Sequence, residues 1–312
     1  TTEIYTLSLH DALPILAVDI ASAEGAELVR TLAREADVVL ENYKVGQLAK
    51  YGLDYASLSA LNPRLVYCSV TGFGQDGPYA QAAGYDFAIQ ATGGLMSVTG
   101  EKDGTPGTEP QKVGVAVADL FTGMYATTAV LAALRQAEHT GRGCHIDAAL
   151  LDVQVAMLAN QGSNHLVGGL TPRRMGNAHA NVVPYQVLPT ADGHIVLAVG
   201  NDGQFARFCA LAGRPEVAQD PRYMTNSQRI AHREELMPVI AGWMLERSTQ
   251  QWCDLLEPNA VPCAPILNLP QVFQHRQVRH RGMQTELPDR HGRSMPLVPN
   301  PMRFDGQRAL AE

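Results

Sequence analysis

Asp119 is the residue whose position in this sequence most clearly favours chemistry. It follows a run of small apolar residues, 113–118, and opens a long predicted helix that Gly141 closes. At a helix start the carboxylate faces unpaired backbone N–H groups and the positive end of the helix dipole, which keep it ionised. The same N–H groups can stabilise an oxyanion on an adjacent acyl group, so Asp119 is a candidate nucleophile. Asp is also a favoured N-cap residue, a purely structural role worth about 1 kcal/mol.

Two loops that follow predicted strands carry further candidates. Asn42, Tyr43, Lys44 and Lys50 follow the strand at residues 36–40, where they could meet phosphates or an adenine. Lysines near a helix start are more often simply solvated. The second loop could move over a site, although glycines there are usually turn chemistry and no P-loop lysine follows. Its residues are Gly200, Asn201, Asp202, Gly203 and Gln204.

The cysteines and histidines show no spacing typical of a metal site. The five cysteines are scattered without a CxxC pair, and His165 and His179 have no partners at ligand spacing. We therefore expect no bound metal. An odd, dispersed set of cysteines indicates reduced thiols in a cytoplasmic protein.

Composition indicates a soluble globular enzyme. Of the 312 residues, 46% are hydrophobic and 18% charged. The net charge of −7, with no basic block, makes nucleic-acid binding a poor hypothesis. The longest apolar stretch lies around residues 126–134, is interrupted by threonines, and predicts a buried helix rather than a membrane span.

The elements that must position these residues alternate in the first half of the chain. Apolar runs at residues 16–20, 36–40 and 65–70 predict strands. The intervening residues predict a helix that Ser22 caps, with Leu28, Leu32 and Ala33 on its apolar face, and a second helix at about 46–60. Strands this apolar indicate an α/β fold with an open, parallel, Rossmann-like sheet covered on both faces. Residues 146–159 favour a strand or a helix, and 160–181 a polar crossover.

The second half changes character near Tyr185. Residues 185–188 and 194–199 flank Ala191-Asp192-Gly193, a hairpin signal, and helical segments follow. We expect a large, incomplete domain at residues 16–182, a smaller α+β domain at 183–270, and a segment at 271–312 that returns towards the large domain.

The first fifteen residues, TTEIYTLSLHDALPI, have the length of a signal peptide but not its pattern. Back-translated, they match an adapter used in short-read DNA sequencing, and a genuine N-terminal strand is the alternative. We expect residues 1–15 to be non-native and the native sequence to begin near Leu16.

Several short motifs follow one another along the chain. They are ADVVLENY (36–43), LNPRLVY (61–67), GFGQDGPY (72–79), GYD (84–86), GGLMSVTG (93–100), Asp119 with TG (122–123), TGRG (140–143) and NAH (177–179). Each motif alone is modest, but the series in this order is highly specific. It resembles the class III CoA-transferases of the carnitine-dehydratase/bile-acid-inducible type, and the likeness covers residues 16 to about 305.

The resemblance implies transfer of coenzyme A from an acyl-CoA donor to a carboxylic acid, with Asp119 forming a mixed anhydride and then an aspartyl-CoA thioester. No cofactor is held permanently; acyl-CoA is the substrate. The mobile loop over the anhydride would be residues 200–204, and the protein would be an interlocked homodimer. The segments implied to contact CoA contain Val18, Asn42, Tyr43, Lys44, Lys50, Tyr85 and Asp86. Lys50 stands where some members carry Arg.

Two alternatives stay open. The same superfamily contains acyl-CoA racemases, but members of that branch carry His where this chain has Tyr85, and tyrosine is a poor base at neutral pH. The resemblance also leads us to expect that the family's first strand–loop–helix and its closing helix are missing here, so an inactive CoA-binding fragment is the other alternative.

Overall fold

A computed structural model describes residues 16–288 and 293–308 of the chain. The adapter-like segment, residues 1–15, lies outside these described residues. The chain divides into two compact units, Val18–Asn181 and a unit that contains Val182–Glu312. This division falls one residue before the boundary expected from the sequence.

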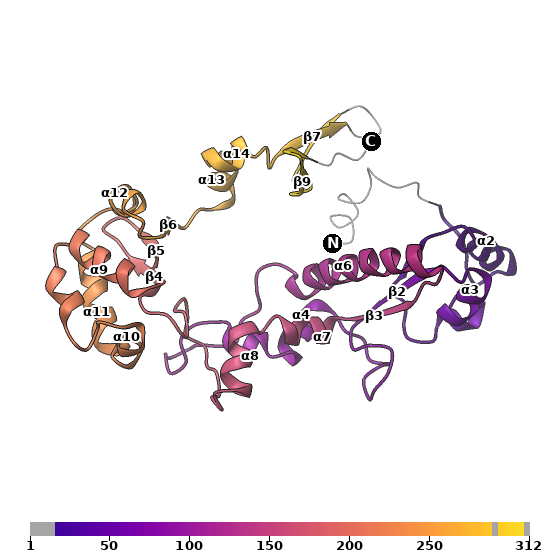
Figure 1. Cartoon of the computed structure of the whole chain (residues 1–312), viewed down its shortest axis with the longest axis horizontal. Coiled ribbons are helices and arrows are strands. Elements are labelled where there is room, and N and C mark those ends of the chain that lie inside the picture. The colour runs from indigo at the N-terminus through magenta and orange to yellow at the C-terminus, as the bar shows by residue number, and fades with distance from the viewer. Residues whose placement is uncertain (1–15, 289–292, 309–312) are drawn as a thin grey trace. The chain divides into compact units, whose positions relative to one another are not determined.

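A parallel three-stranded sheet forms the centre of the first unit. Its strands are β1 (Val38–Glu41), β2 (Val66–Thr71) and β3 (His145–Ala149), in the order β1-β2-β3. Helix α3 (Tyr55–Leu61) connects β1 to β2, and α6 (Val117–Thr140), which Figure 1 shows alongside β2 and β3, lies between β2 and β3 in sequence. The parallel α/β sheet predicted from the apolar runs is confirmed.

Alternating residues of β2 serve two different cores. Val66 and Cys68 pack against alanines of α6, whereas Tyr67 packs with Leu48 and Leu58 on the opposite face. Because successive side chains of a strand point to opposite faces, β2 is buried on both sides.

Helix α6 is long, apolar and only partly covered. It ends at Gly141, whose φ of 72° is the left-handed C-cap that the sequence predicted. Among the described helices it is the one long and apolar enough to cross a membrane by length and composition, but one face packs on the sheet. The expectation of a buried helix holds for the face that packs on the sheet and is wrong for the other, which exposes Leu120, Phe121, Met124, Tyr125 and Leu131.

Three local predictions for the first unit are wrong. Residues 16–20 form no strand, and α2 (Ala23–Ala33), capped by Ser22 as expected, exposes Leu28 and Leu32. It packs through Gly25, Ala26 and Ala33 instead, since small side chains allow close approach. The helix expected at 46–60 is two pieces, η1 (Leu48–Tyr51) and α3, separated at Gly52, whose φ of 62° ends the first.

Four short helices complete the first unit. They are α4 (Asp86–Thr92), α5 (Leu95–Val98), α7 (Leu150–Ala156) and α8 (Ala159–Leu166). Residues 146–159, predicted as strand or helix, contain both, because β3 passes directly into α7.

The second unit contains an antiparallel sheet with the order β4-β5-β6 (Tyr185–Pro189, His194–Ala198 and Cys263–Pro265). The predicted hairpin between β4 and β5 is confirmed. The helical elements are α9 (Asp202–Leu211), η2 (Pro215–Gln219), α10 (Asn226–Ala231), α11 (Arg233–Met244), α12 (Thr249–Leu256) and η3 (Glu257–Asn259). Their core includes Phe205, Phe208, Trp252 and residues of all three strands.

Short elements end the described chain. They are α13 (Leu269–Gln274), α14 (Arg276–His280) and the two-stranded pairs β7–β8 (Thr285–Pro288, Ser294–Leu297) and β9–β10 (Arg303–Phe304, Gln307–Arg308). The return of this segment towards the first unit stays a prediction.

Candidate active site

A cavity of about 470 Å³ lies in the first unit where the parallel strands end. Residues that follow β1, the end of β2 and the residue after β3 all contribute to its wall. Ligands bind at this carboxyl edge in open α/β sheets. The lining residues are Asn42, Tyr43, Lys44, Val45, Val70, Thr71, Gly72, Ala80, Ala82, Ala83, Gly84, Tyr85, Asp86, Asp119, Thr122, Gly123 and Leu150.

The backbones of two glycines, Gly72 and Gly84, are in contact beside this cavity and bring together the two ends of the loop between them. A Cβ added to Gly72 would lie 2.4 Å from the Cα of Gly84, and the reverse distance is the same. No side chain fits at either position. The contact fixes Tyr85 and Asp86 next to the end of β2, although eleven residues of chain separate the two glycines.

Asp119 lies in the first turn of α6 and forms part of the wall of this cavity. The N-cap position is Ala116, without a side-chain cap, so the prediction that Asp119 stands at the start of the helix is wrong by three residues. The side chain is exposed, and no described residue forms a hydrogen bond with its carboxylate. A carboxylate that performs no capping is available for other chemistry.

The neighbouring N–H groups are less available than the sequence suggested. The N–H groups of Val117 and Leu120 donate to Val115 O and Ala116 O, at 2.8 and 3.0 Å. The Ala118 N–H donates to the Asp86 carboxylate. The expected set of free helix donors for an oxyanion is therefore largely occupied.

Asp86 is held by a partly buried chain of hydrogen bonds. Its Oδ1 accepts the Ala118 N–H at 2.8 Å, and its Oδ2 accepts the Gln90 side-chain amide at 2.7 Å. Gln90 is fully buried, and its Oε1 accepts the Val113 N–H at 2.9 Å. These bonds fix a second carboxylate beside the first turn of α6.

The pKa of Asp119 is raised from its ordinary value. Partial burial of the carboxyl is the larger cause, and the nearby charge of Asp86 is the second. This differs from the expectation that the helix start simply keeps Asp119 ionised. The ionised carboxylate is then more basic than an ordinary aspartate, which favours nucleophilic attack.

The structure places the residues implied to contact CoA in two groups. Asn42, Tyr43, Lys44, Tyr85 and Asp86 line the cavity with Asp119, and Lys44 is the one cation among the described lining residues.

The other two residues of that set do not line this cavity. Val18 lies in the irregular segment before α2, and Lys50 is exposed on η1, where Leu48 provides the packing contact. A contact between CoA and either residue stays a prediction.

The segment expected to be a mobile loop is the beginning of α9. Asn201 caps this helix by accepting the Gln204 N–H at 2.9 Å, and Gln204 Oε1 accepts the Gly200 N–H at 2.7 Å. Asp202 accepts from Arg229, which is fully buried, at 2.8 Å. The description as a loop is therefore wrong from Asp202 onward, because this cap starts the helix there. The shielding role stays a prediction.

Sequence reasoning missed the residues that shape the cavity through long-range contacts. Gln90 carries no local signal. Gly123 was recognised as part of the TG motif at 122–123 but was given no role, although a helix-interior glycine one turn after Asp119 is itself a signal. An adjacent cavity of about 340 Å³ shares Lys44 and contains Ser69, which hydrogen-bonds His145 Nε2 at 2.9 Å. It lies on the opposite face of β2 from α6.

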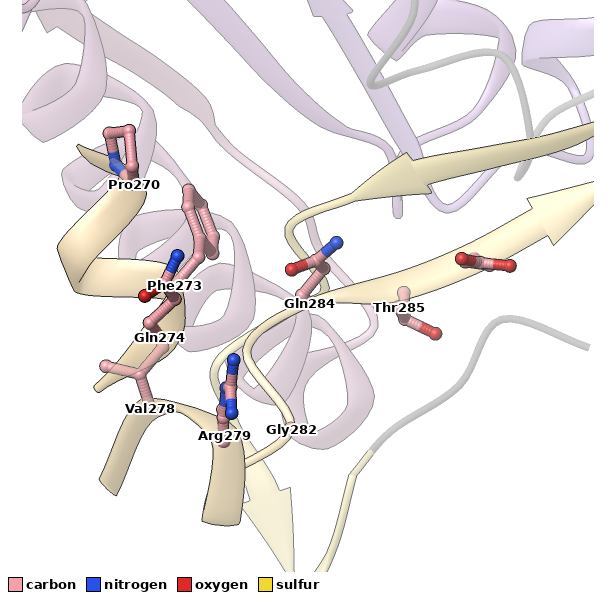
Figure 2. Close-up of a pocket in the computed structure, with 9 residues that line it drawn as sticks. Pro270, Phe273, Gln274, Val278, Arg279, Gly282, Gln284 and Thr285 are labelled. Atoms are coloured by element: carbon pink, nitrogen blue, oxygen red, sulfur yellow. The ribbon is translucent and has the colours of Figure 1, made fainter. Parts of the chain in front are cut away.

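A cavity of about 550 Å³ in the second unit is a weaker candidate. Figure 2 shows Phe273 and Gln274 from α13 and Val278 from α14 facing Gln284 and Thr285 near β7. Its charged lining residues, Arg279 and Glu286, lie on separate elements, and none of the candidate nucleophile or ligand residues lines it.

Comparisons with known proteins agree on one family. The sequence profile of CoA-transferase family III matches residues 5–311, so the match begins within the adapter-like segment. Succinate–glutarate CoA-transferase of Agrobacterium fabrum is 51% identical over 92% of this chain and 71% of its own length. Human succinyl-CoA:glutarate CoA-transferase is 40% identical, and the chain spans 65% of that enzyme. The crystal structure of a CaiB/BaiF family protein from Brucella suis superposes with a TM-score of 0.76, at 47% identity, over 93% of this chain and 75% of that one.

Proposed function

The chain belongs to CoA-transferase family III, and we propose that it moves coenzyme A from an acyl-CoA donor to a carboxylic acid through Asp119. The observation that carries this proposal is the exposed Asp119 carboxylate, without a hydrogen-bond partner among the described residues, in the wall of the cavity at the sheet edge. The names of the two relatives support CoA transfer as the reaction class.

The proposed reaction has two stages: CoA moves from the donor to Asp119, and then from Asp119 to the acceptor acid. The Asp119 carboxylate attacks the thioester carbonyl of the donor, the C–S bond breaks, and CoA thiolate leaves a mixed anhydride. The thiolate then attacks the Asp119 carbonyl, which releases the donor acid and forms an aspartyl-CoA thioester. The acceptor carboxylate repeats these steps in reverse and departs as the new CoA ester, which regenerates Asp119.

The neighbouring residues have distinct proposed roles. The charge of Asp86 and partial burial raise the pKa of Asp119 and so increase the basicity of its ionised carboxylate. Lys44 offers its ammonium to a phosphate or to a substrate carboxylate, and Asn42, Tyr43 and Tyr85 contact the pantetheine or nucleotide. The absence of histidine among the described lining residues supports transfer over racemisation, which needs an acid/base pair.

We propose C4 and C5 dicarboxylic acids as the substrate class. The support is that the relatives at 51% and 40% identity are both named for succinate or succinyl-CoA and glutarate. We further propose a homodimer, supported by the large apolar side chains that α6 exposes. Sedimentation equilibrium of the purified chain tests the dimer directly.

An oxygen-isotope experiment tests both the reaction and the nucleophile. Succinyl-CoA and glutarate labelled with ¹⁸O in its carboxylates are incubated with the protein, and the product ester and the Asp119 peptide are analysed by mass spectrometry. The anhydride route transfers one ¹⁸O into Asp119, because the acceptor's oxygen stays on the aspartate when CoA leaves with the acyl group. Glu138, an exposed carboxylate on the same helix, serves as the unlabelled control. Glutaryl-CoA without labelled Asp119 would refute the covalent route, and no exchange with any dicarboxylic acid would refute the proposed reaction.

A further inference from the structure

Three metal-ligating side chains come together in the second unit, outside the residues used above. The Sγ atoms of Cys253 and Cys263 and a carboxylate oxygen of Glu257 all lie within 4.8 Å of one another. Within the part of the chain that the structure describes, no other group of His, Cys, Asp or Glu meets this condition. The spacing C-x₃-E-x₅-C gave no signal in the sequence.

Regular secondary structure builds this cluster. Cys253 and Glu257 are one turn apart at the end of α12, and the Glu257 N–H donates to Cys253 O, so their side chains share a helix face. The chain then reverses through η3 and Ala260, whose φ is 55°. The Val261 N–H donates to Leu256 O at 3.1 Å, which returns the chain over the helix end.

The third ligand is fixed by the sheet. Cys263 begins β6 and pairs with Leu197 of β5, while the Ala198 N–H donates to Pro262 O at 2.9 Å. All three side chains therefore project from a helix end or a paired strand, and not from a free loop. Ligands on such elements are held close to one geometry before an ion arrives.

The surroundings of the cluster are asymmetric. Cys253 is 5% exposed and Cys263 is half-buried, whereas Glu257 is exposed. An ion can enter from the side of Glu257, and water can reach the same side. A divalent cation bound here displaces the two thiol protons and takes the thiolates as ligands.

We propose that Cys253, Glu257 and Cys263 bind a zinc-class divalent cation, with water at the fourth position of a tetrahedral site. Two thiolates and a carboxylate are donors that Zn²⁺ accepts, and the mixture of soft and hard atoms excludes Mg²⁺ and Ca²⁺ as natural occupants. The bound ion ties the end of α12 to β6 and stabilises the second unit. This site is independent of Asp119 and of the proposed transfer.

Cobalt provides the test, because a Co²⁺ ion bound by thiolates has an intense charge-transfer absorption that neither free Co²⁺ nor a carboxylate site shows. The reduced, chelator-treated full chain is titrated with Co²⁺ and then with Zn²⁺. We expect the absorption to saturate at one equivalent, to disappear when Zn²⁺ displaces Co²⁺, and to be lost in the double variant Cys253→Ser/Cys263→Ser. Zn²⁺ should also raise the melting temperature of the wild-type chain but not of that variant.

Milder variants and matched controls separate metal binding from misfolding. Glu257→Gln changes an exposed side chain and keeps both thiols, so it should retain the fold by circular dichroism yet bind Co²⁺ more weakly. Asp254→Asn removes the neighbouring exposed carboxylate of α12, and Cys144→Ser removes a thiol of the first unit; both should bind like the wild type. An absorption that persists without Cys253 and Cys263 would overturn the proposal. So would a failure of the folded wild-type chain to bind Co²⁺, and recovery of the two thiols as a disulfide after purification would then identify a redox pair instead.

Discussion

Asp86 accepts the backbone N–H of Ala118 at 2.8 Å, so a fixed negative charge stands beside the residue that precedes Asp119. A helix start offers its N–H groups to any nearby carboxylate. In this protein Asp86 receives that donor, whereas no described residue hydrogen-bonds the Asp119 carboxylate. One carboxylate thus performs the structural role and leaves the other available to react.

Replacement of Asp119 should stabilise the fold while it abolishes transfer. The pKa of Asp119 is raised by burial and by Asp86, so the folded protein binds this proton more tightly than the unfolded chain does. Below the ordinary aspartate pKa of about 3.9, both states are protonated and no cost exists. As the pH rises from there through the raised pKa, the ionised carboxylate destabilises the folded state.

Asp119→Asn should therefore have a higher free energy of unfolding than the wild type near neutral pH, and an equal one at strongly acidic pH. Urea titrations of both proteins across this range measure the difference. Glu138→Gln, on the same helix, should leave the free energy of unfolding unchanged at both acidic and neutral pH. A variant less stable than the wild type at neutral pH would show that Asp119 has a stabilising partner.

Gln90→Leu should destabilise the first unit by about 1–3 kcal/mol. The substitution leaves the Val113 N–H and Asp86 Oδ2 without their buried partner, and an unpaired buried polar group costs about that much. Gln136→Leu, an exposed position on α6, should stay within about 0.5 kcal/mol of the wild type. Denaturant titrations provide both values. Equal losses at the two positions would contradict a structural role for the chain Val113–Gln90–Asp86.

Gly123→Ala should separate stability from substrate binding. An added Cβ meets no atom within 4 Å, so alanine should stabilise the helix by about 0.5–1 kcal/mol. The same methyl group enters the cavity wall one turn from Asp119, and we expect KM for the CoA ester to rise more than kcat falls.

Gly72→Ala is the contrasting variant, because its Cβ would lie 2.4 Å from the Gly84 Cα. It should lose about 1–3 kcal/mol of stability through overpacking. Melting curves and steady-state kinetics of the two variants make the comparison. A Gly123→Ala protein with unchanged KM would place the substrate away from this wall.

Arg229→Met should cost about 1–3 kcal/mol for each of the two buried backbone carbonyls that lose their donor, while the exposed Asp202 carboxylate becomes solvated. Arg229 is fully buried and donates to Val183 O, Tyr223 O and Asp202, at 2.7, 2.9 and 2.8 Å. Arg222→Ala breaks an exposed ion pair with Asp220 and should cost about 0–1 kcal/mol. Chemical unfolding measures the free energy of unfolding of both variants. A decrease for Arg222→Ala as large as that for Arg229→Met would refute the prediction.

Local patterns predicted the elements whose signals are contained in a few residues. The apolar runs at 36–40 and 65–70 are long enough to indicate two buried strands. Ala191-Asp192-Gly193, between two apolar segments, is typical of a hairpin turn. Gly141 ends α6 because a left-handed residue is required there.

Long-range contacts explain the features that the sequence did not reveal. Asp119 was placed at the helix start because nothing in Val117 or Ala118 distinguishes a first turn from a preceding loop. Gln90 reaches Val113 only once α4 has packed beside the start of α6. Cys263 approaches Cys253 because the chain reverses at Ala260, an alanine in a conformation that glycine usually adopts.

The contact between Gly72 and Gly84 suggests how an enzyme of this architecture could be retargeted. Both ends of the intervening loop are fixed at one point, so a loop of another length can be grafted there without displacement of Asp86 or α6. Ala80, Ala82 and Ala83 of this loop form part of the cavity wall. Exchange of the loop would change the shape of the cavity and leave Asp119, the proposed nucleophile, in place.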